Sequence, residues 1–173
     1  MVAKGLYAPP ILMGHSIGGL AILKYAEQYP TAALVAIASV VPAEAGAPAS
    51  DFAFESDQPY LPPPFKLAHR VFFDGLTEAD ARLCNERLHP ISQRRMYEGA
   101  NHILHVDKGK ITVPGLAVSG EWDPLCPASV MQSMSEYYDF DYVCKSGRGH
   151  NLPLEPNWRG TAEDIASWLD QKI

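Results

Sequence analysis

The chain has 173 residues, of which 47% are hydrophobic and 20% are charged, and its formal net charge is −6 at pH 7. This length and this balance are typical of a single globular domain with a substantial buried core, and they exclude a disordered protein. The acidic balance argues against a nucleic-acid-binding surface, and no apolar run in the sequence approaches the roughly 20 residues of a membrane helix.

The first predicted elements are a very short strand over residues 10–13 and a helix over residues 17–28. Between them, residues 14–18 read Gly-His-Ser-Ile-Gly and match the pattern G-x-S-x-G. Where a strand, a tight turn and a helix follow one another, this pattern is typical of a nucleophile elbow. Such a turn lifts the serine clear of the sheet, where a histidine can take its proton. Ser16 is therefore the candidate nucleophile.

Small residues are needed around such a turn, because the strand and the helix approach each other closely. Gly14 and Gly18 stand two positions on either side of Ser16, and we expect Gly19 to allow close packing of the helix. The free N–H groups at a helix N-terminus stabilise a developing oxyanion. We expect the backbone N–H of Ile17 to be the first such donor.

A long excursion follows the second predicted strand. Residues 34–41 form a continuous apolar run, which predicts a strand buried on both faces of a parallel sheet. Three predicted helices come next, over residues 65–73, from Thr77 onward, and over residues 91–100. Long connections inside a compact domain are usually functional, so we interpret residues 43–105 as a helical cap inserted over the site. The alternative is a merely structural helical insert.

The remainder of the chain continues the alternation of strands and helices, with strands over residues 111–119 and 140–145 and helices over residues 127–138 and 157–171. In the last helix we expect an inward face formed by Ala162, Ile165, Ala166, Trp168 and Leu169. This order of elements predicts an α/β fold, with a mostly parallel sheet, flanking helices and a helical cap insertion, in a single domain over residues 1–173. We expect the elbow strand at or near the edge of a four-stranded sheet.

Ser16 requires a general base, and the base requires an acceptor that fixes its tautomer. Asp123 lies in the loop after one predicted buried strand, and His150 lies in the loop after the next. Because the carboxyl ends of parallel strands share one edge of a sheet, we expect all three side chains at that edge. The sequence therefore predicts a catalytic triad of Ser16, His150 and Asp123.

Other residues are weaker candidates for substrate binding. His15 lies inside the elbow, and Phe72, Phe73 and Met96 lie in the insertion, where helical spacing makes packing the alternative role. Arg148 is interpreted either as a binding residue or as plain surface, and the same holds for Asn151 on the other side of His150.

A metal site is not expected. His102 and His105 have a spacing of three residues, but no third ligand follows at a recognisable distance in the sequence. We therefore expect neither a metal ion nor a cofactor.

Three motifs carry a resemblance to a known family: residues 14–19 (GHSIGG), residues 120–123 (GEWD) with Pro124 and Pro127, and Gly149-His150. In this order they resemble the α/β-hydrolase fold superfamily, of the capped serine esterase and lysophospholipase-like kind. The resemblance covers nearly the whole chain. It implies cleavage of a carboxylic ester, or a similar acyl bond, of a small apolar substrate. Ser16 would attack, His150 would act as base and then as acid, and Asp123 would orient His150.

The sequence departs from the pattern of this superfamily before the elbow. Members carry several strands there, and the loop after the third supplies a second oxyanion donor, often in a His-Gly sequence. Only about ten residues precede the elbow strand in this sequence. The second hypothesis is therefore a truncated or split hydrolase that is inactive alone. Its exposed sheet edge would pair with a partner chain or with a second copy, as a homodimer. An incomplete gene model is a variant of this hypothesis.

The cysteines indicate the compartment. Cys84, Cys126 and Cys144 are odd in number and widely spaced, which fits a reducing compartment better than a disulfide framework or a zinc site. The start of the sequence has no apolar segment typical of a signal peptide. We therefore expect a cytoplasmic protein.

Overall fold

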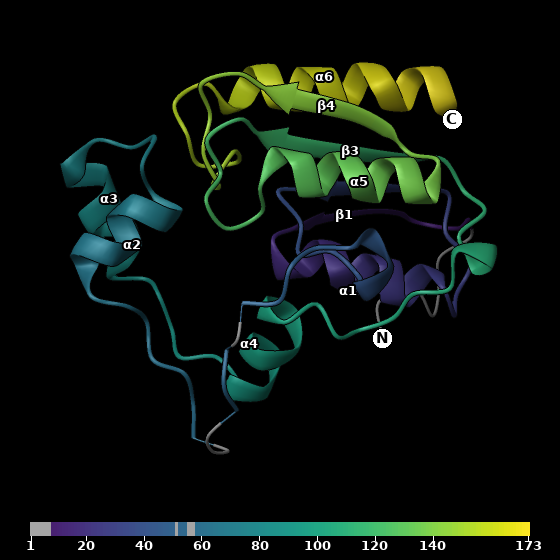
Figure 1. Ribbon diagram of the computed structural model, residues 1–173. Coiled ribbons are helices and arrows are strands. Elements are labelled where there is room, and N and C mark those ends of the chain that lie inside the picture. The colour runs from purple at the N-terminus through teal and green to yellow at the C-terminus, as the bar shows by residue number, and fades with distance from the viewer. Residues whose placement is uncertain (1–7, 51, 55–57) are drawn as a thin grey trace.

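The structure, a computed structural model, describes residues 8–50, 52–54 and 58–173 (Figure 1). Its centre is a four-stranded sheet in the order β1-β2-β3-β4, formed by β1 (Ile11–His15), β2 (Ala33–Ile37), β3 (Gly115–Gly120) and β4 (Asp141–Lys145). All neighbouring strands are parallel, so their carboxyl ends point to one edge of the sheet. The predicted α/β fold with a parallel sheet is confirmed, and the elbow strand β1 lies at its edge.

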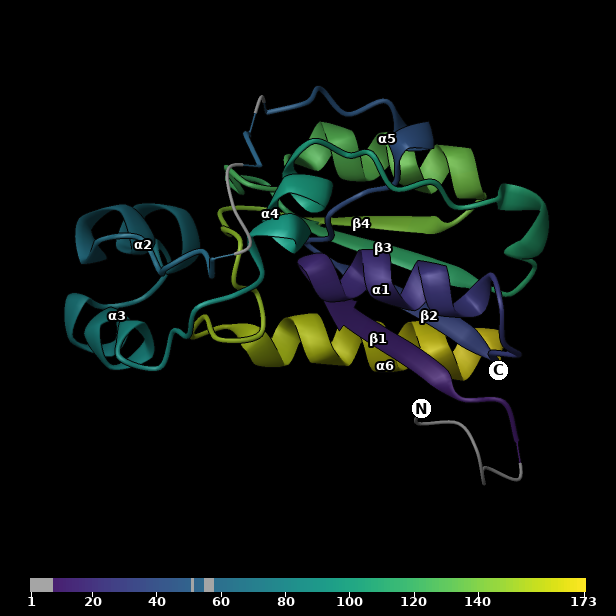
Figure 2. The ribbon, with the colours of Figure 1, turned by 90° about the horizontal axis from the view of Figure 1, so that it is seen from below.

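Helices cover both faces of the sheet. Helices α1 (Ile17–Ala26) and α5 (Ala128–Tyr138) pack on one face, and α6 (Trp158–Lys172) packs on the other (Figure 1 and Figure 2). Along β2, Leu34 and Ala36 join the core with α1 and α5, whereas Val35 and Ile37 join the core with α6. A strand that is apolar at every position needs a helix on each side, because its side chains alternate between the two faces. Within the described part of the chain, no helix is long and apolar enough to cross a membrane.

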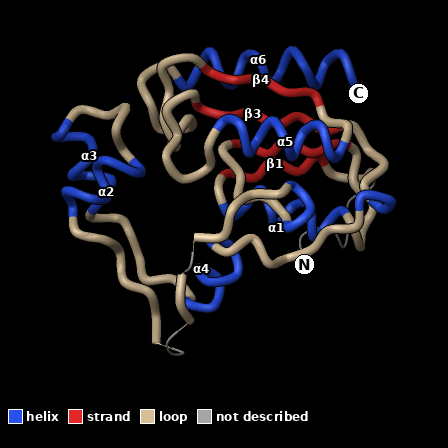
Figure 3. Tube along the Cα trace, viewed as in Figure 1, coloured by secondary structure: helices blue, strands red, loops and turns tan. Residues whose placement is uncertain are grey.

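Residues 38–114 connect β2 to β3. In the described part of residues 43–105 this connection carries the helical segments η1 (Ala43–Ala45), α2 (Phe65–Phe72), α3 (Glu78–Asn85) and α4 (Gln93–Ala100). Helices α2 and α3 lie apart from the sheet, beyond the carboxyl ends of the strands (Figure 3). They share a small core around Ala68, Phe73 and Ala81. Helix α4 lies beside α1, and the short helix η2 (Lys108–Lys110) leads back to β3.

Several boundaries differ from those predicted from the sequence. Strand β2 ends at Ile37 rather than at residue 41, because Ala38 has a φ of 42°. The next two N–H groups then leave the sheet, since Ser39 donates to Met131 Sδ and Val40 donates to the Ser16 carbonyl. Apolar character predicted the extent of burial here, but hydrogen bonding decides where the strand ends.

The predicted inward face of α6 was wrong at two positions. Ile165 is buried and Trp168 is half-buried, whereas Ala162 and Ala166 are exposed. The helix buries only a narrow stripe against β2, β3 and β4, and Thr161 takes part in that stripe instead of the neighbouring alanine. Hydrophobicity alone does not set the rotation of a helix about its axis when small residues extend the apolar face.

Candidate active site

Ser16 lies between β1 and α1 in a strained backbone conformation, with φ 54° and ψ −125°. Non-glycine residues rarely adopt a positive φ, and they do so mainly where the surrounding structure enforces it. Three backbone hydrogen bonds of 3.0 Å hold the turn. The Ser16 N–H donates to the Ile37 carbonyl, and the Ser16 carbonyl accepts from the N–H groups of Gly19 and Val40. The turn has the geometry expected of a nucleophile elbow.

Close approach of the strand and the helix explains two of the glycines in this turn. A Cβ at Gly14 would lie 2.3 Å from the Gly18 carbonyl oxygen, and a Cβ at Gly19 would lie 2.0 Å from Ser39 Oγ. A Cβ at Gly18 would meet nothing within 4 Å. The expectation that lack of space requires glycine at position 18 was therefore wrong. The backbone of Gly18 takes part in the close contact, and the contact is possible because Gly14 has no Cβ.

His150 and Asp123 form a buried pair. His150 Nδ1 lies 2.9 Å from Asp123 Oδ2, and the two side chains are 2% and 0% exposed. The other carboxylate oxygen of Asp123 accepts the N–H groups of Leu125 and Cys126 at 2.8 and 2.9 Å. Because the carboxylate only accepts, the shared proton lies on Nδ1 and leaves Nε2 available as a base.

The predicted triad residues lie at the same edge of the sheet, in the connections that follow β1, β3 and β4. The elbow contacts the histidine loop directly. His15 Nε2 lies 2.9 Å from the His150 carbonyl oxygen, and the two ring centroids are 4.9 Å apart. Among the described residues, no hydrogen bond joins the Ser16 hydroxyl to His150. Without a bound substrate this contact is often long, and it shortens when the substrate binds.

The weaker candidates are placed at different distances from this pair. The Phe72 ring centroid lies 6.2 Å from that of His150, whereas Phe73 is 3% exposed inside the core of α2 and α3. Met96 is half-buried on α4. The structure thus brings His15 and Phe72 to His150, and substrate contact by any of these four residues stays a prediction.

A charged pair next to His150 was missed by the sequence analysis. Arg148 is not plain surface, because it is 9% exposed and forms an ion pair with Glu155, which is 3% exposed; substrate binding by Arg148 stays a prediction. No motif marks Glu155. The only signal in the sequence is that opposite charges occur in one short loop, and this does not distinguish a buried pair from two solvated side chains.

Among the described side chains, one group has the spacing of a metal site, because ligand atoms of Asp123, Cys126 and His150 lie within 4.8 Å of one another. Burial and the nearby Asp123 charge raise the pKa of the Cys126 thiol well above its usual value. The thiol therefore keeps its proton, and both Asp123 oxygens already accept hydrogen bonds. These donors and acceptors fit a hydrogen-bonded pair better than a metal centre.

Comparisons with known proteins bear on the fold and on the family of the chain. Among the solved structures that share the fold is a monoacylglycerol lipase from Paleococcus ferrophilus, with 20% sequence identity and a TM-score of 0.65 over 98% of this chain and 71% of that chain. A methylesterase from Arabidopsis has 15% identity and a TM-score of 0.69 over 95% of this chain and 72% of that chain. An esterase from Rhodococcus sp. has 17% identity and a TM-score of 0.71 over 99% of this chain and 68% of that chain. No curated protein matches the sequence. The model of a family described as the Alpha/beta hydrolase family matches residues 2–164. The chain therefore belongs to the alpha/beta hydrolase family of enzymes.

Proposed function

We propose that this protein is a serine hydrolase that cleaves a carboxylic ester, or a similar acyl bond, of a small apolar substrate. The observation that carries the proposal is the buried His150–Asp123 pair, at the same sheet edge as the strained Ser16 turn. The esterases and the lipase that share the fold support the same class of bond.

Each residue of the proposed triad has one task. The Ser16 hydroxyl attacks the ester carbonyl carbon while His150 Nε2 takes its proton, and Asp123 stabilises the imidazolium that forms. The backbone N–H of Ile17, at the start of α1, faces the developing oxyanion. His150 then protonates the leaving alcohol. Water hydrolyses the acyl-serine ester with the same histidine as its base, and Ser16 is regenerated.

Residues 43–105 supply the proposed cap and the walls of the substrate site. Helices α2 and α3 lie beyond the strand ends that carry the triad, and Phe72 reaches His150 from α2. A cavity of about 100 Å³ lies between α1 and α4, beside Ile17, and its lining includes both apolar side chains, such as Leu20 and Leu104, and the charged side chains of Lys24, Arg95 and Glu98.

We place the protein in the cytoplasm. All three cysteines are free, and Cys144 is exposed. Unpaired thiols, one of them accessible, are usual in a reducing compartment and rare in secreted proteins.

The first experiment is labelling of the purified protein with a fluorophosphonate probe, alongside Ser16→Ala and His150→Ala. We expect the parent to be labelled and both variants to be silent, and we then expect the parent to cleave short-chain 4-nitrophenyl esters faster than long-chain ones. A parent that is folded, as judged by circular dichroism, but is not labelled by the probe would contradict the proposal.

A second candidate function rests on the exposed edge of the sheet. Ile11 and Met13 on β1 are 45% and 53% exposed. Their partners in the register are Ala33 and Val35, and Val35 is covered by α6. The apolar face of the sheet therefore extends from β2 to β1, beyond the part that α6 covers. Exposed apolar edges of this kind are common where a strand from another chain is added to the sheet. We propose a second copy of the chain, or a separate partner chain, as the molecule that pairs with β1.

The mass in solution tests this second candidate. We expect a dimer by size-exclusion chromatography with light scattering, and we expect Met13→Lys to convert it to a monomer. Thr112→Lys, at a distance from β1 in the sequence and outside the strands, is the control that adds the same charge. A parent that is monomeric and active at all concentrations would overturn it.

A further inference from the structure

We infer that Glu155 is a positioning residue that holds the loops of His150 and Asp123 in register with each other. This inference rests on the proposed function, in which these two residues are the base and its orienting acid. In the described part of the chain, Glu155 forms no hydrogen bond with the side chain of His150 or of Asp123. It acts through the two residues that immediately precede His150.

Glu155 binds both of these residues. One carboxylate oxygen accepts Arg148 Nε, and the other accepts the N–H of Gly149 at 2.9 Å. All three groups lie in the buried part of the loop. A buried arginine needs a negative partner, and Arg148 Nη2 has no hydrogen-bond partner among the described residues. The charge of Glu155 therefore keeps Arg148 inside the fold.

The backbone of the same two residues holds the loop of the acid. The Arg148 carbonyl accepts the N–H of Trp122, the residue before Asp123, at 2.8 Å. The Gly149 carbonyl oxygen packs against Gly120, where a Cβ would lie 2.1 Å away. The two loops are thus in contact at residues that come shortly before Asp123 and His150 in the sequence. A shift of Arg148 would change the distance between His150 Nδ1 and Asp123 Oδ2.

The carboxylate of Glu155 also lies against the turn between α2 and α3. A Cβ at Gly75 would lie 2.8 Å from Glu155 Cδ, and a Cβ at Gly149 would lie 2.2 Å from an oxygen of Asp74. Burial, and then the charge of Glu155, raise the pKa of Asp74, which agrees with two carboxyl groups in close approach. Helix α2 carries Phe72 to His150, so the same buried carboxylate touches both the loop of the base and the turn that follows α2.

The decisive variant replaces both partners, as Arg148→Met with Glu155→Leu. Removal of both charges leaves no buried ion unpaired, so the double variant is expected to lose less stability than either single variant. The Gly149 N–H nevertheless loses its acceptor. We expect fluorophosphonate labelling to slow at least tenfold, with kcat for a short-chain ester falling more than KM changes. If the double variant is labelled at the parental rate, Glu155 serves only to neutralise Arg148 and the inference is overturned.

A readout that does not need activity separates this inference from the proposed function. The proton on His150 Nδ1, held by Asp123, is expected to give a low-field proton resonance in the NMR spectrum of the parent. We expect this resonance to broaden or disappear in the double variant, whether or not the parent takes label. A double variant with an unchanged resonance would contradict the inference. An unlabelled parent that shows the resonance would contradict only the proposed function.

Two single substitutions keep the test valid if the double variant does not fold. Gly75→Ala adds a methyl group on an exposed turn and pushes against the Glu155 carboxylate, so labelling is expected to slow severalfold and the resonance to broaden. Gly160→Ala is its control, since a Cβ there meets nothing within 4 Å. A Gly75→Ala protein that matches Gly160→Ala in both readouts would count against the inference.

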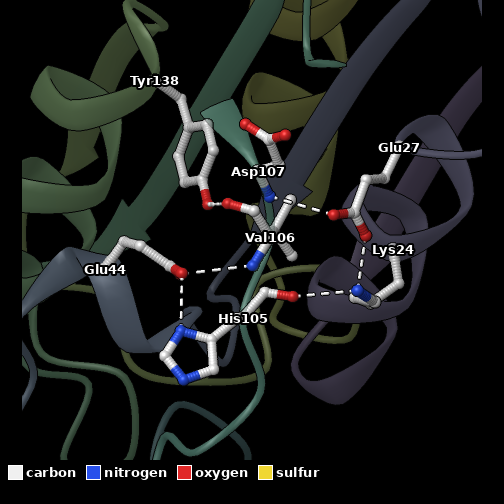
Figure 4. Close-up of polar contacts among 7 residues, drawn as sticks. All are labelled: Lys24, Glu27, Glu44, His105, Val106, Asp107 and Tyr138. Carbon is white, nitrogen blue, oxygen red and sulfur yellow. Dashed lines mark hydrogen bonds and ion pairs between the residues drawn. The ribbon is translucent and has the colours of Figure 1, made fainter. Parts of the chain in front are cut away.

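Glu44→Gln is the matched control for loss of a bridging carboxylate. Glu44 accepts His105 Nδ1 at 2.7 Å and the N–H of Val106 at 3.2 Å, as Figure 4 shows. The side chain of Tyr138, the last residue of α5, donates to the Val106 carbonyl in the same cluster. This cluster lies at the end of α5 that leads into β4, away from the loop that follows β4. We expect Glu44→Gln to lower the melting temperature and to leave both readouts unchanged.

Discussion

The imidazole of His15 donates from Nε2 to the main-chain carbonyl of His150 at 2.9 Å, and this bond ties the residue before the candidate nucleophile to the candidate base. A carbonyl only accepts, so the proton lies on Nε2 of His15. Burial is the main reason that the pKa of His15 lies below its usual value. His15 is therefore neutral at pH 7, and its bond links the residue before Ser16 to the backbone of His150.

Loss of this bond should weaken both the fold and the site. In His15→Phe the ring volume is retained, but the buried His150 carbonyl loses its donor, which costs about 1–3 kcal/mol. We expect fluorophosphonate labelling to slow by about an order of magnitude, because a loss of 1.4 kcal/mol in positioning is a factor of ten. Urea denaturation and labelling rates measure the two effects. A variant with parental stability and rate would show that the bond is incidental.

The pH dependence of stability should also report on His15. Its pKa is lowered on folding, so below about pH 6.5 the unfolded chain binds more protons than the folded chain, and stability falls as the pH falls toward the folded pKa. We expect His15→Phe to lose this part of the slope between pH 8 and pH 5. Urea denaturation at several pH values measures it, with His89→Gln, an exposed histidine, as the control. Equal slopes in the parent and in His15→Phe would contradict the prediction.

The strain at Ser16 should be measurable as stability. Glycine adopts the φ of 54° without penalty, whereas alanine keeps the Cβ that causes the strain. We expect Ser16→Gly to be more stable than Ser16→Ala by about 1–2 kcal/mol, and neither variant to take label. Urea denaturation of the two variants checks this. The opposite order of stability would mean that the turn is relaxed.

Two glycines of the elbow should respond in opposite ways to the same substitution. Gly14→Ala places a Cβ 2.3 Å from a backbone oxygen, and we expect it to destabilise the protein by about 2 kcal/mol or more. Gly18→Ala lies in open space in the first turn of α1, and we expect it to be neutral or stabilising by up to about 1 kcal/mol. Thermal unfolding compares them. Equal losses in the two variants would contradict this assignment.

Asp141 should stabilise the junction of β4 and α6 in a pH-dependent way. Lys172 and then Trp168 donate to its carboxylate and lower its pKa. A lowered pKa in the folded state gives stability that is present above the unfolded pKa of about 3.9 and is lost as the pH falls through the folded value. Because the group is exposed, we expect Asp141→Asn to cost less than about 1 kcal/mol at pH 7. The difference from the parent should vanish near pH 2 in urea denaturation.

By itself the sequence determined the class of the fold and the identity of the candidate triad. Strands that are apolar at every position need helices on both faces, so the α/β layering could be predicted from residues 34–41 and from the alternation of elements. Ser16, Asp123 and His150 were found because each follows a strand, and parallel strands end at one edge of the sheet.

Only the tertiary structure decided how the site is held together. The bond from His15 to His150 joins residues that are distant in the sequence. The burial of Arg148 with Glu155 and the open space at Gly18 depend on how the loops and helices pack around them. Periodicity indicates which face of an element is buried, because apolar side chains gather on that face. It does not record which buried polar group meets which, because that depends on the final packing of the loops.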